Sequence, residues 1–199
     1  MSFPLPDVSH LPLNDLLSLR GRKAVITGGA QGLGFAVASR FAEAGADVVL
    51  ADVKLDIAES SAADLADKFG IRALAVETDV TDAQAVATLA DKTVETLGGI
   101  DIWVNNAGIF PAVPSVDMPI EQWDQVFSIN TRGAFLGARE AAKRMGESGG
   151  AIINMVSTAG FQSPGPGLAA YVSSKHAVRG MTKAMAQEFA PSGIRVLGV

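Results

Sequence analysis

Short apolar runs alternate along the chain with alanine-rich segments whose apolar residues recur every three to four positions. The runs show almost no polar alternation, which is typical of strands buried on both faces of a parallel sheet. We expect these strands at 23–27, 47–52, 72–80, 100–108, 151–157 and 194–199. The periodic segments predict helices at 33–44, 54–69, 82–97, 121–145 and 171–190. With right-handed crossovers, this pattern predicts an α/β fold, a doubly wound parallel sheet in the strand order 3-2-1-4-5-6 with helices on both faces.

Two helix starts have recognisable signals. The sequence TDAQ at 81–84 has the spacing of a capping box, with Thr81 as the N-cap and Gln84 three residues later. Further along, Asp117 is a candidate cap, and Pro119 stands in a first turn, where proline is tolerated. No linker-like segment interrupts the alternation. We therefore expect a loosely attached arm at 1–19 and a single domain at 20–199.

The first expected strand runs directly into TGGAQGLG at 27–34, which precedes a helix. Its glycines permit a tight turn and a close approach of backbone N–H groups, and the helix directs its positive end to the same place, which suits a pyrophosphate. The spacing is T-G-x-x-x-G-x-G, and it matches neither the common G-x-G-x-x-G nor a P-loop. A glycine-rich turn without a ligand is the alternative, but the position after the first strand favours a nucleotide site. The candidate cofactor-binding residues here are Thr27, Gly28, Gln31, Gly32, Leu33 and Gly34.

Two aspartates follow the second and third expected strands. Asp52 ends the run DVVLAD, where a carboxylate can accept hydrogen bonds from an adenosine ribose and would repel a 2′-phosphate. This position favours NAD over NADP, although Asp52 can also cap the helix that begins near Lys54. Asp79 has the same two interpretations, and capping is the weaker of them because Thr81 fills that role.

Composition narrows the classes of function. The chain is 48% apolar and 19% charged, as in an ordinary globular domain, and it has no cysteine, which excludes disulfides and thiolate metal sites. Its net charge of −5, without a cluster of Lys and Arg, argues against nucleic acids and anionic membranes as partners. No run of eighteen apolar residues exists to span a membrane, and the first residues lack the basic region of a secretory signal, so we expect a cytoplasmic protein. Two distant histidines give no constellation of metal ligands.

The only tyrosine, Tyr171, lies four residues before Lys175, so both side chains are expected on one face of the last helix. A lysine cation and the positive nicotinamide ring of an oxidised cofactor both favour a phenolate. Lowering a tyrosine pKa by ~3 units requires about 4 kcal/mol. Such a tyrosine can accept the hydroxyl proton of an alcohol while hydride leaves the carbon. A packing tyrosine beside a solvated lysine is the alternative for this spacing taken alone.

Five segments together resemble the short-chain dehydrogenase/reductase family in their order and spacing. They are TGGAQGLG, NNAG at 105–108, FSIN with Asn130, INMVSTAG with Ser157, and YVSSK at 171–175. The resemblance extends from about Leu19 to the last residue. It implies a Rossmann fold and hydride transfer between NAD and a secondary alcohol or ketone.

The resemblance also implies a role for each matching residue. Tyr171 would be the acid/base, and Lys175 would favour its phenolate and hold the nicotinamide ribose. Ser157 would orient the substrate oxygen, and Asn130 would anchor a water that passes the proton out past Lys175. The other implied cofactor-binding residues are Asn106, Ala107 and Gly108 after the fourth strand, and Asp79 and Val80 beside the adenine.

Family members continue beyond IRVLGV through a substrate lid, another helix and a seventh strand. We therefore expect a domain that is incomplete at its C-terminus and has no seventh strand. A catalytically inactive nucleotide-binding or oligomerisation module is the alternative function, and NADP with Asp52 turned aside is the alternative cofactor. The family assembles through its last two long helices, which implies a homo-oligomer, either a dimer or a homotetramer.

Two sets of side chains outside these segments also carry expectations. An apolar substrate wall is expected from Phe110, Pro111 and Phe161. Solvated positions on helix faces are expected for Asp124, Glu140 and Glu188.

Overall fold

The computed structural model describes residues 7–199, apart from the side chain of Glu147. In this part of the chain, parallel strands form one sheet in the order β3-β2-β1-β4-β5-β6, which confirms the expected fold class and strand order. The strands are β1 Lys23–Thr27, β2 Asp47–Asp52, β3 Ala73–Glu77, β4 Ile102–Asn105, β5 Gly150–Asn154 and β6 Ile194–Gly198. Residues 1–6 of the expected arm lie outside the described residues.

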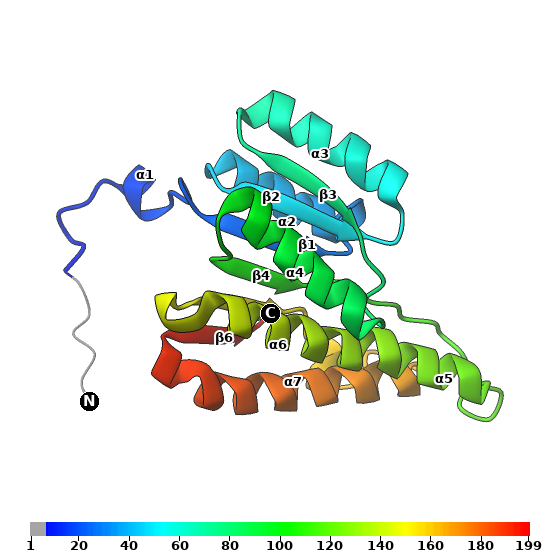
Figure 1. Ribbon diagram of the computed structural model, residues 1–199. Helices are drawn as coiled ribbons and strands as arrows, with labels where there is room; N and C mark the ends of the chain where they lie inside the picture. Colours follow the sequence, from blue (N-terminus) through cyan, green and yellow to red (C-terminus); the bar gives the residue numbers. More distant parts are fainter. Residues whose placement is uncertain (1–6) are drawn as a thin grey trace.

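The helices follow the strands in alternation (Figure 1). The α-helices are α1 Leu13–Leu16, α2 Gly32–Glu43, α3 Leu55–Phe69, α4 Ala83–Leu97, α5 Ile120–Phe127, α6 Ala134–Met145 and α7 Ala169–Phe189. Short 3-10 turns lie at Gly146–Ser148, Thr158–Gly160 and Ala190–Ser192, and a π-helical segment at Ser128–Gly133 joins α5 to α6.

Alternating side chains of the strands fill two separate cores. In β1, Ala24 and Ile26 pack on one face of the sheet and Val25 on the other, and all are fully buried. Helices α2 and α3 cover the first face, whereas α4, α6 and α7 cover the second, where α6 and α7 run side by side (Figure 1). Each fully buried Val or Ile stabilises the fold by roughly 1.5–3 kcal/mol. The sheet is therefore a rigid platform for the loops at its ends.

The cover on the α2/α3 face does not extend to β6. Ile194 and Val196 of β6 are buried against α7, but Leu197 points to the opposite face and is exposed to 49%. The expectation of helices on both faces of the sheet is confirmed, and at the edge strand β6 the described residues place a helix on the α7 face.

The part of the chain around α1, within residues 7–18, extends away from the body of the molecule (Figure 1). The backbone N–H of Leu19 donates a hydrogen bond to the carbonyl of Ala44, and Leu19 packs against the α2/α3 core. Leu13 and Leu17 are exposed to 68% and 66%. Among the residues described, no helix combines the length and the apolar character needed to cross a membrane.

Three expected strands are shorter than the sequence pattern indicates, and the strand expected at 151–157 is Gly150–Asn154. The strand expected at 72–80 ends at Glu77, which is paired with the last residue of β2, and the strand expected at 100–108 is only Ile102–Asn105. Residues 78–80 and 106–108 leave the sheet and line a cavity at its edge. Polar residues and glycine interrupt the apolar pattern there, which agrees with the early ends of β3 and β4.

Both expected helix caps are wrong. The N-cap of α4 is Asp82, whose side chain accepts a hydrogen bond from the backbone N–H of Gln84, and Thr81 instead donates its hydroxyl to Asp79. The N-cap of α5 is Pro119, with no side-chain cap, so Asp117 does not have that role. Thr81 and Asp82 are both residue types that commonly cap helices. In this structure the Thr81 hydroxyl is bonded to Asp79, and Asp82 is the cap.

The single helix expected at 121–145 is interrupted by the π-helical segment around Asn130. The expectation of a solvated Glu140 on this helix is also wrong, because Glu140 is only 3% exposed. Its carboxylate accepts hydrogen bonds from Arg139, Lys143 and Arg144. Asp124 and Glu188 are exposed, as expected.

Candidate functional site

A cavity of about 890 Å³ lies at the carboxyl ends of the strands. Open α/β sheets bind ligands at this edge, beside the point where the strand order reverses between β1 and β4. The cavity brings together most of the sequence-predicted residues: Gly28, Gln31, Gly32, Leu33, Gly34, Asp52, Asp79, Val80, Asn106, Ala107, Gly108, Ser157, Tyr171 and Lys175. Two predicted residues, Thr27 and Asn130, lie behind this lining.

The glycine-rich turn fits closely against its surroundings. A Cβ atom at Gly34 would lie 2.0 Å from the carbonyl oxygen of Gly28, so only glycine lets α2 approach the end of β1 this closely. Gln31 is the N-cap residue of α2, and its backbone is extended. The unpaired N–H groups of the first turn of α2 therefore face the cavity, where they attract an anion.

Asp52 holds the turn and the next helix together. Its two carboxylate oxygens accept hydrogen bonds from the backbone N–H groups of Ala30, at 3.2 Å, and Lys54, at 3.1 Å. The alternative that Asp52 caps the next helix is wrong, because the N-cap of α3 is Lys54 and no side chain caps that helix. Because the same carboxylate also lines the cavity, a ribose hydroxyl can reach it there.

Thr27 supports the floor of the cavity from behind. Its hydroxyl, which is 2% exposed, accepts hydrogen bonds from the backbone N–H groups of Asn106 at 3.0 Å and Ala107 at 3.2 Å. In turn, the Asn106 side chain donates to the carbonyls of Thr27 and Gly28. These contacts lock the segment after β4 against the glycine-rich turn.

Asn130 acts as a clamp between the loop after β4 and α7. Its Oδ1 accepts from the N–H of Ile109 at 2.9 Å, and its Nδ2 donates to the carbonyl of Ile109 at 2.8 Å and to the hydroxyl of Ser174 at 3.1 Å. Asn130 is 2% exposed and lies in the π-helical segment. Such segments often occur at functional sites. Both N–H groups of its side-chain amide are used in these contacts, so the side chain of Asn130 has no donor left for a water.

Lys175 is the most perturbed ionisable group of the cavity. It is 6% exposed, and its ammonium group donates to the carbonyl of Met155 at 2.6 Å. Burial lowers the pKa of Lys175 from 10.5 to about 8. The nitrogen lies 5.6 Å from the ring centroid of Tyr171, which confirms that the four-residue spacing places both side chains together.

Ser157 has an unusual backbone. Its φ of 78° and ψ of 157° lie in a region that is almost exclusive to glycine, and it is the only non-glycine residue with positive φ among the described residues. Its hydroxyl accepts from the N–H of Ala159 at 3.2 Å, and its own N–H donates to the carbonyl of Val199. Strain of this kind persists where the surrounding structure fixes the residue, and it places the Ser157 hydroxyl at the cavity.

A buried network fixes α7, which carries Tyr171 and Lys175, to the sheet. Asn105 donates to the side-chain oxygen of Asn154 at 2.8 Å, and Asn154 donates to the hydroxyl of Thr182 at 2.9 Å. Trp103 donates to Asn105 from the other side. The network therefore joins β4, β5 and α7 beneath the cavity.

The apolar part of the lining was only partly expected. Phe110 lines the cavity, but Pro111 and Phe161 do not. Sequence reasoning missed the lining residues Val53, Thr78, Ile109, Ile129, Met155 and Val199. Val53, Thr78, Ile109 and Ile129 each adjoin a predicted site residue, whereas Met155 and Val199 directly follow the ends of β5 and β6. Their proximity in sequence was therefore the available signal.

Other ionisable side chains do not gather at the cavity. Within residues 7–199, no group of three or more His, Asp or Glu side chains is placed to hold a metal ion. His176 is exposed, and its ring nitrogen lies 3.0 Å from the carbonyl of Val172 on its own helix.

Comparisons with known proteins agree with this architecture. Residues 22–199 match the family model described as short chain dehydrogenase. A D-threitol dehydrogenase of Mycolicibacterium smegmatis is 39% identical over 180 residues, which is 89% of this chain and 68% of that protein. A 3beta-hydroxysteroid dehydrogenase of Eggerthella lenta is 38% identical over 180 residues, with the same shares covered.

Solved structures show the same fold. A short-chain type dehydrogenase/reductase from Mycobacterium marinum superposes with a TM-score of 0.89 at 40% identity, over 92% of this chain and 73% of that one. The sequence, the family model and the fold agree over nearly the whole chain. The protein therefore belongs to the short-chain dehydrogenase family of oxidoreductases.

Proposed function

We propose that the protein transfers a hydride between NAD and a secondary alcohol or ketone, with Tyr171 as the proton carrier. The main support is one arrangement: Tyr171, Lys175 and Ser157 line the same cavity as the glycine-rich turn at the N-terminus of α2. The two named relatives are, by their names, dehydrogenases of an alcohol and of a hydroxysteroid.

The cavity fits a dinucleotide in its size and in its donors. Gly32 has a φ of 59°, and a Cβ atom there would meet nothing within 4 Å, so open space lies above this backbone. A pyrophosphate in that space would accept hydrogen bonds from the first N–H groups of α2. Asp52 and Asp79 at the far strands would hold the adenosine half, and Lys175 would hold the nicotinamide ribose. When bound, the nicotinamide supplies the hydride acceptor or donor.

The chain itself handles the proton. In the oxidative direction, the Tyr171 oxygen would take the hydroxyl proton of the alcohol, and the cationic Lys175 favours the phenolate that can do so. Ser157 would donate a hydrogen bond to the same substrate oxygen and hold it toward Tyr171. The proton would then leave past Lys175 through a water held at the backbone of Asn130.

The cofactor preference rests on Asp52. Its carboxylate lines the cavity at the end of β2, where a 2′-phosphate would meet a negative charge. We propose NAD on this ground. Binding of NADP would require Asp52 to leave its contacts with Ala30 and Lys54.

Assembly is part of the proposal as well. Phe135 on α6 is 41% exposed although it is a large apolar residue, which is consistent with a homo-oligomer formed through α6 and α7. A dimer or tetramer in light scattering would support it, and a monomer at micromolar concentration would contradict it.

The proposed mechanism is tested by Tyr171→Phe. This variant keeps the ring and its packing but loses the oxygen, so reduction of ketones by NADH should fall at least a hundredfold. Affinity for NADH, measured by fluorescence, should change less than threefold. Wild-type turnover in the variant would refute the mechanism. NADH binding by the wild type without turnover of any alcohol or ketone would indicate a nucleotide-binding module without catalysis.

A further inference from the structure

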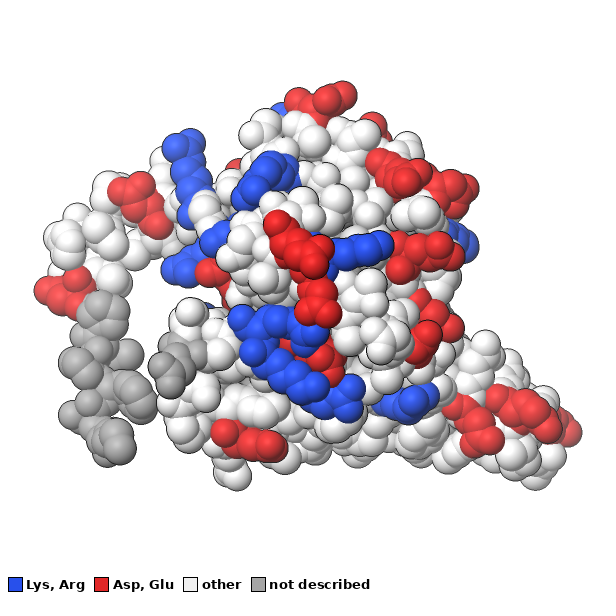
Figure 2. All heavy atoms as spheres, in the orientation of Figure 1, with Lys and Arg blue, Asp and Glu red and all other residues white. Residues whose placement is uncertain are grey.

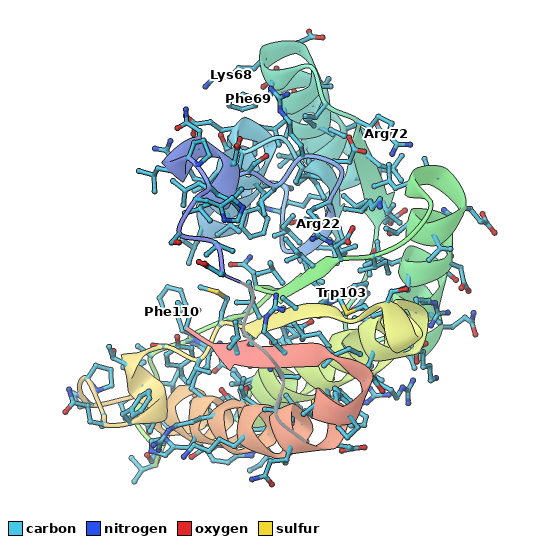
Figure 3. The ribbon with its side chains drawn as sticks, turned by 90° about the vertical axis from the view of Figure 1, so that its left-hand side faces the viewer. Arg22, Lys68, Phe69, Arg72, Trp103 and Phe110 are labelled. Carbon is cyan, nitrogen blue, oxygen red and sulfur yellow. The ribbon has the colours of Figure 1, made fainter. Side chains whose placement is uncertain are left out.

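Phe110 lies beside Tyr171 in the cavity, and the proposed mechanism gives this aromatic side chain no role. Phe110 is 72% exposed, although large apolar side chains at a cavity are normally covered. Its ring centroid lies 5.9 Å from that of Tyr171, with the ring planes tilted by 58°. In Figure 3, Phe110 stands at the carboxyl ends of the strands, whereas Arg22 and Arg72 lie at the opposite ends. The ring of Phe110 is therefore accessible beside Tyr171 in the same cavity.

The backbone that presents Phe110 is fixed. Both the N–H and the carbonyl of the preceding residue, Ile109, are bonded to the side chain of Asn130. Three residues further on, the N–H of Val113 donates to the carbonyl of Gly167 at 2.8 Å, in the loop that leads into α7. The backbone on both sides of Phe110 is thus held in place, so little backbone ordering is needed when a ligand meets the ring.

Charge is distributed unevenly along the cavity. Its charged lining residues are Asp52, Asp79 and Lys175. The two aspartates lie at β2 and after β3, which the sheet order separates from Ser157 and Tyr171 by β1 and β4. Besides the buried Lys175, the described lining around the two hydroxyls is apolar, with Ile109, Phe110 and Met155. This end offers hydrogen bonds for one oxygen and apolar surface for the rest of a substrate.

We propose that Phe110 is a specificity-determining residue that selects substrates with an aromatic or other flat apolar group beside the reacting carbon. This inference rests on the proposed function, because the substrate oxygen must meet Tyr171 for the neighbouring group to reach the Phe110 ring. The ring would take that group edge-to-face or offset-stacked, the arrangements that aromatic pairs prefer. Polyols and charged substrates would gain nothing from this contact.

Phe161 provides a matched control. It is also exposed, to 65%, and belongs to the loop between Ser157 and Tyr171, but it does not line the cavity. Its ring packs instead against the guanidinium of Arg179, at 4.1 Å. Phe161→Ala removes an exposed ring close in sequence to the site without touching the proposed contact.

The kinetic test compares acetophenone with butanone as substrates for reduction by NADH. Phe110→Ala should lower the ratio of kcat/KM for acetophenone to that for butanone by a factor of roughly 3 to 10, since an aromatic pair contributes about that much. Phe110→Leu should lower the ratio less, because apolar area remains. Phe161→Ala should leave the ratio within twofold. An unchanged ratio in Phe110→Ala, or an equal drop in Phe161→Ala, would overturn the inference while leaving the proposed function intact.

A binding test does not depend on turnover. Because Tyr171 is the only tyrosine, labelling with 3-fluorotyrosine gives one fluorine NMR signal at the site. In the presence of NAD, acetophenone should shift this signal in the wild type, with an affinity weaker by a factor of roughly 3 to 10 in Phe110→Ala and unchanged in Phe161→Ala. If this holds but no ketone is reduced, the proposed function fails and the aromatic site stands. If acetophenone never shifts the signal, the inference is wrong whatever the turnover.

Discussion

At the scale of the residue, the site depends on Lys175, whose burial as a cation lowers the stability of the folded protein. Lys175 is 6% exposed, and burial lowers its pKa to about 8. The unfolded chain therefore binds more protons than the folded chain between pH 8 and 10.5. Within that window stability rises with pH, and below it the folded protein carries the whole cost of a buried cation, about 3 kcal/mol.

Replacement of Lys175 should therefore stabilise the protein. At pH 7, Lys175→Met is expected to raise the free energy of unfolding by up to about 3 kcal/mol, because a side chain of similar length remains without its charge. The difference from wild type should shrink between pH 8 and 10.5 as the wild-type ammonium is lost. Urea denaturation across this pH range measures it.

Lys183 on the same helix is the control, because it is exposed. Lys183→Met should change the free energy of unfolding by less than about 0.5 kcal/mol at every pH. A stability gain in Lys175→Met that stays constant from pH 7 to pH 11 would contradict the assignment of the cost to the charge.

Sequence predicted the members of the site well but not their partners. Tyr171 and Lys175 were recognisable because a helix repeats every 3.6 residues, so their spacing alone sets their shared face. The clamp that Asn130 forms with Ile109 and Ser174 joins residues that are far apart in the chain, and no local pattern encodes it. The same holds for Asp82, which displaces Thr81 as a cap only because Asp79 binds the threonine hydroxyl.

At the scale of the element, α6 is held to α4 by an ionic cluster around the buried Glu140, which we define as Asp91, Arg139, Glu140, Lys143 and Arg144. Arg144 bridges the two helices, since it donates to both Glu140 and Asp91. Figure 2 shows the Lys and Arg side chains gathered over α6, with acidic side chains among them. Burial opposes the ionisation of Glu140, but the hydrogen bonds from Lys143, Arg144 and Arg139 outweigh it and lower the pKa of Glu140.

Loss of this carboxylate should destabilise the fold. Glu140→Gln leaves three cations without their shared partner, and the partly buried Arg144 loses most, so we expect a loss of roughly 2–3 kcal/mol at pH 7. The lowered pKa of Glu140 means that its ionised form stabilises the folded state. This stabilisation is lost as the pH falls through the Glu140 pKa, so the difference in free energy of unfolding between Glu140→Gln and wild type should disappear there.

Glu188→Gln on the exposed side of α7 is the matched substitution and should cost less than about 0.5 kcal/mol. Thermal unfolding of both variants from pH 3 to pH 8 provides the comparison. An equal effect of the two substitutions, or an effect of Glu140→Gln that does not depend on pH, would argue against the ionic cluster as the link between α4 and α6.

The ionic cluster could not be predicted from the sequence, because its charged residues follow a pattern common on exposed helix faces. Residues 139, 140, 143 and 144 form a charged stretch of the kind that normally faces solvent, and only the approach of α4 buries Glu140. The interruption of the expected helix 121–145 has a similar origin. The apolar period of the sequence continues through residues 128–133, although these residues form a π-helical segment. Within this segment Asn130 bonds to Ile109, which lies outside the helix.

At the scale of the whole molecule, the order of the strands was predictable from the sequence, and this order brings the residues of the site together. Right-handed connections leave few arrangements for alternating strands and helices, and the order 3-2-1-4-5-6 is the simplest. This order brings the end of β1 beside the end of β4, so that residues near 28, 52, 106, 157 and 171 share one cavity. The same order places the predicted residues Asp52 and Asp79 at one edge of the sheet, away from Lys175, so the distribution of charge across the cavity follows from the strand order as well.

That distribution predicts how cofactors stabilise the molecule. A ligand that binds only the folded state, at a hundred times its Kd, adds about 2.7 kcal/mol, which is roughly 5–10 °C in Tm for a chain of this size. NAD should produce such a shift, and NADP at the same concentration should produce a smaller one, because its 2′-phosphate would lie against Asp52. Asp52→Asn keeps the acceptor for Ala30 and should narrow the gap between the two cofactors. Asp56→Asn removes a nearby charge outside the cavity lining and should leave the gap unchanged. A larger Tm shift with NADP than with NAD in the wild type would reverse the assignment of Asp52, and with it the proposed cofactor.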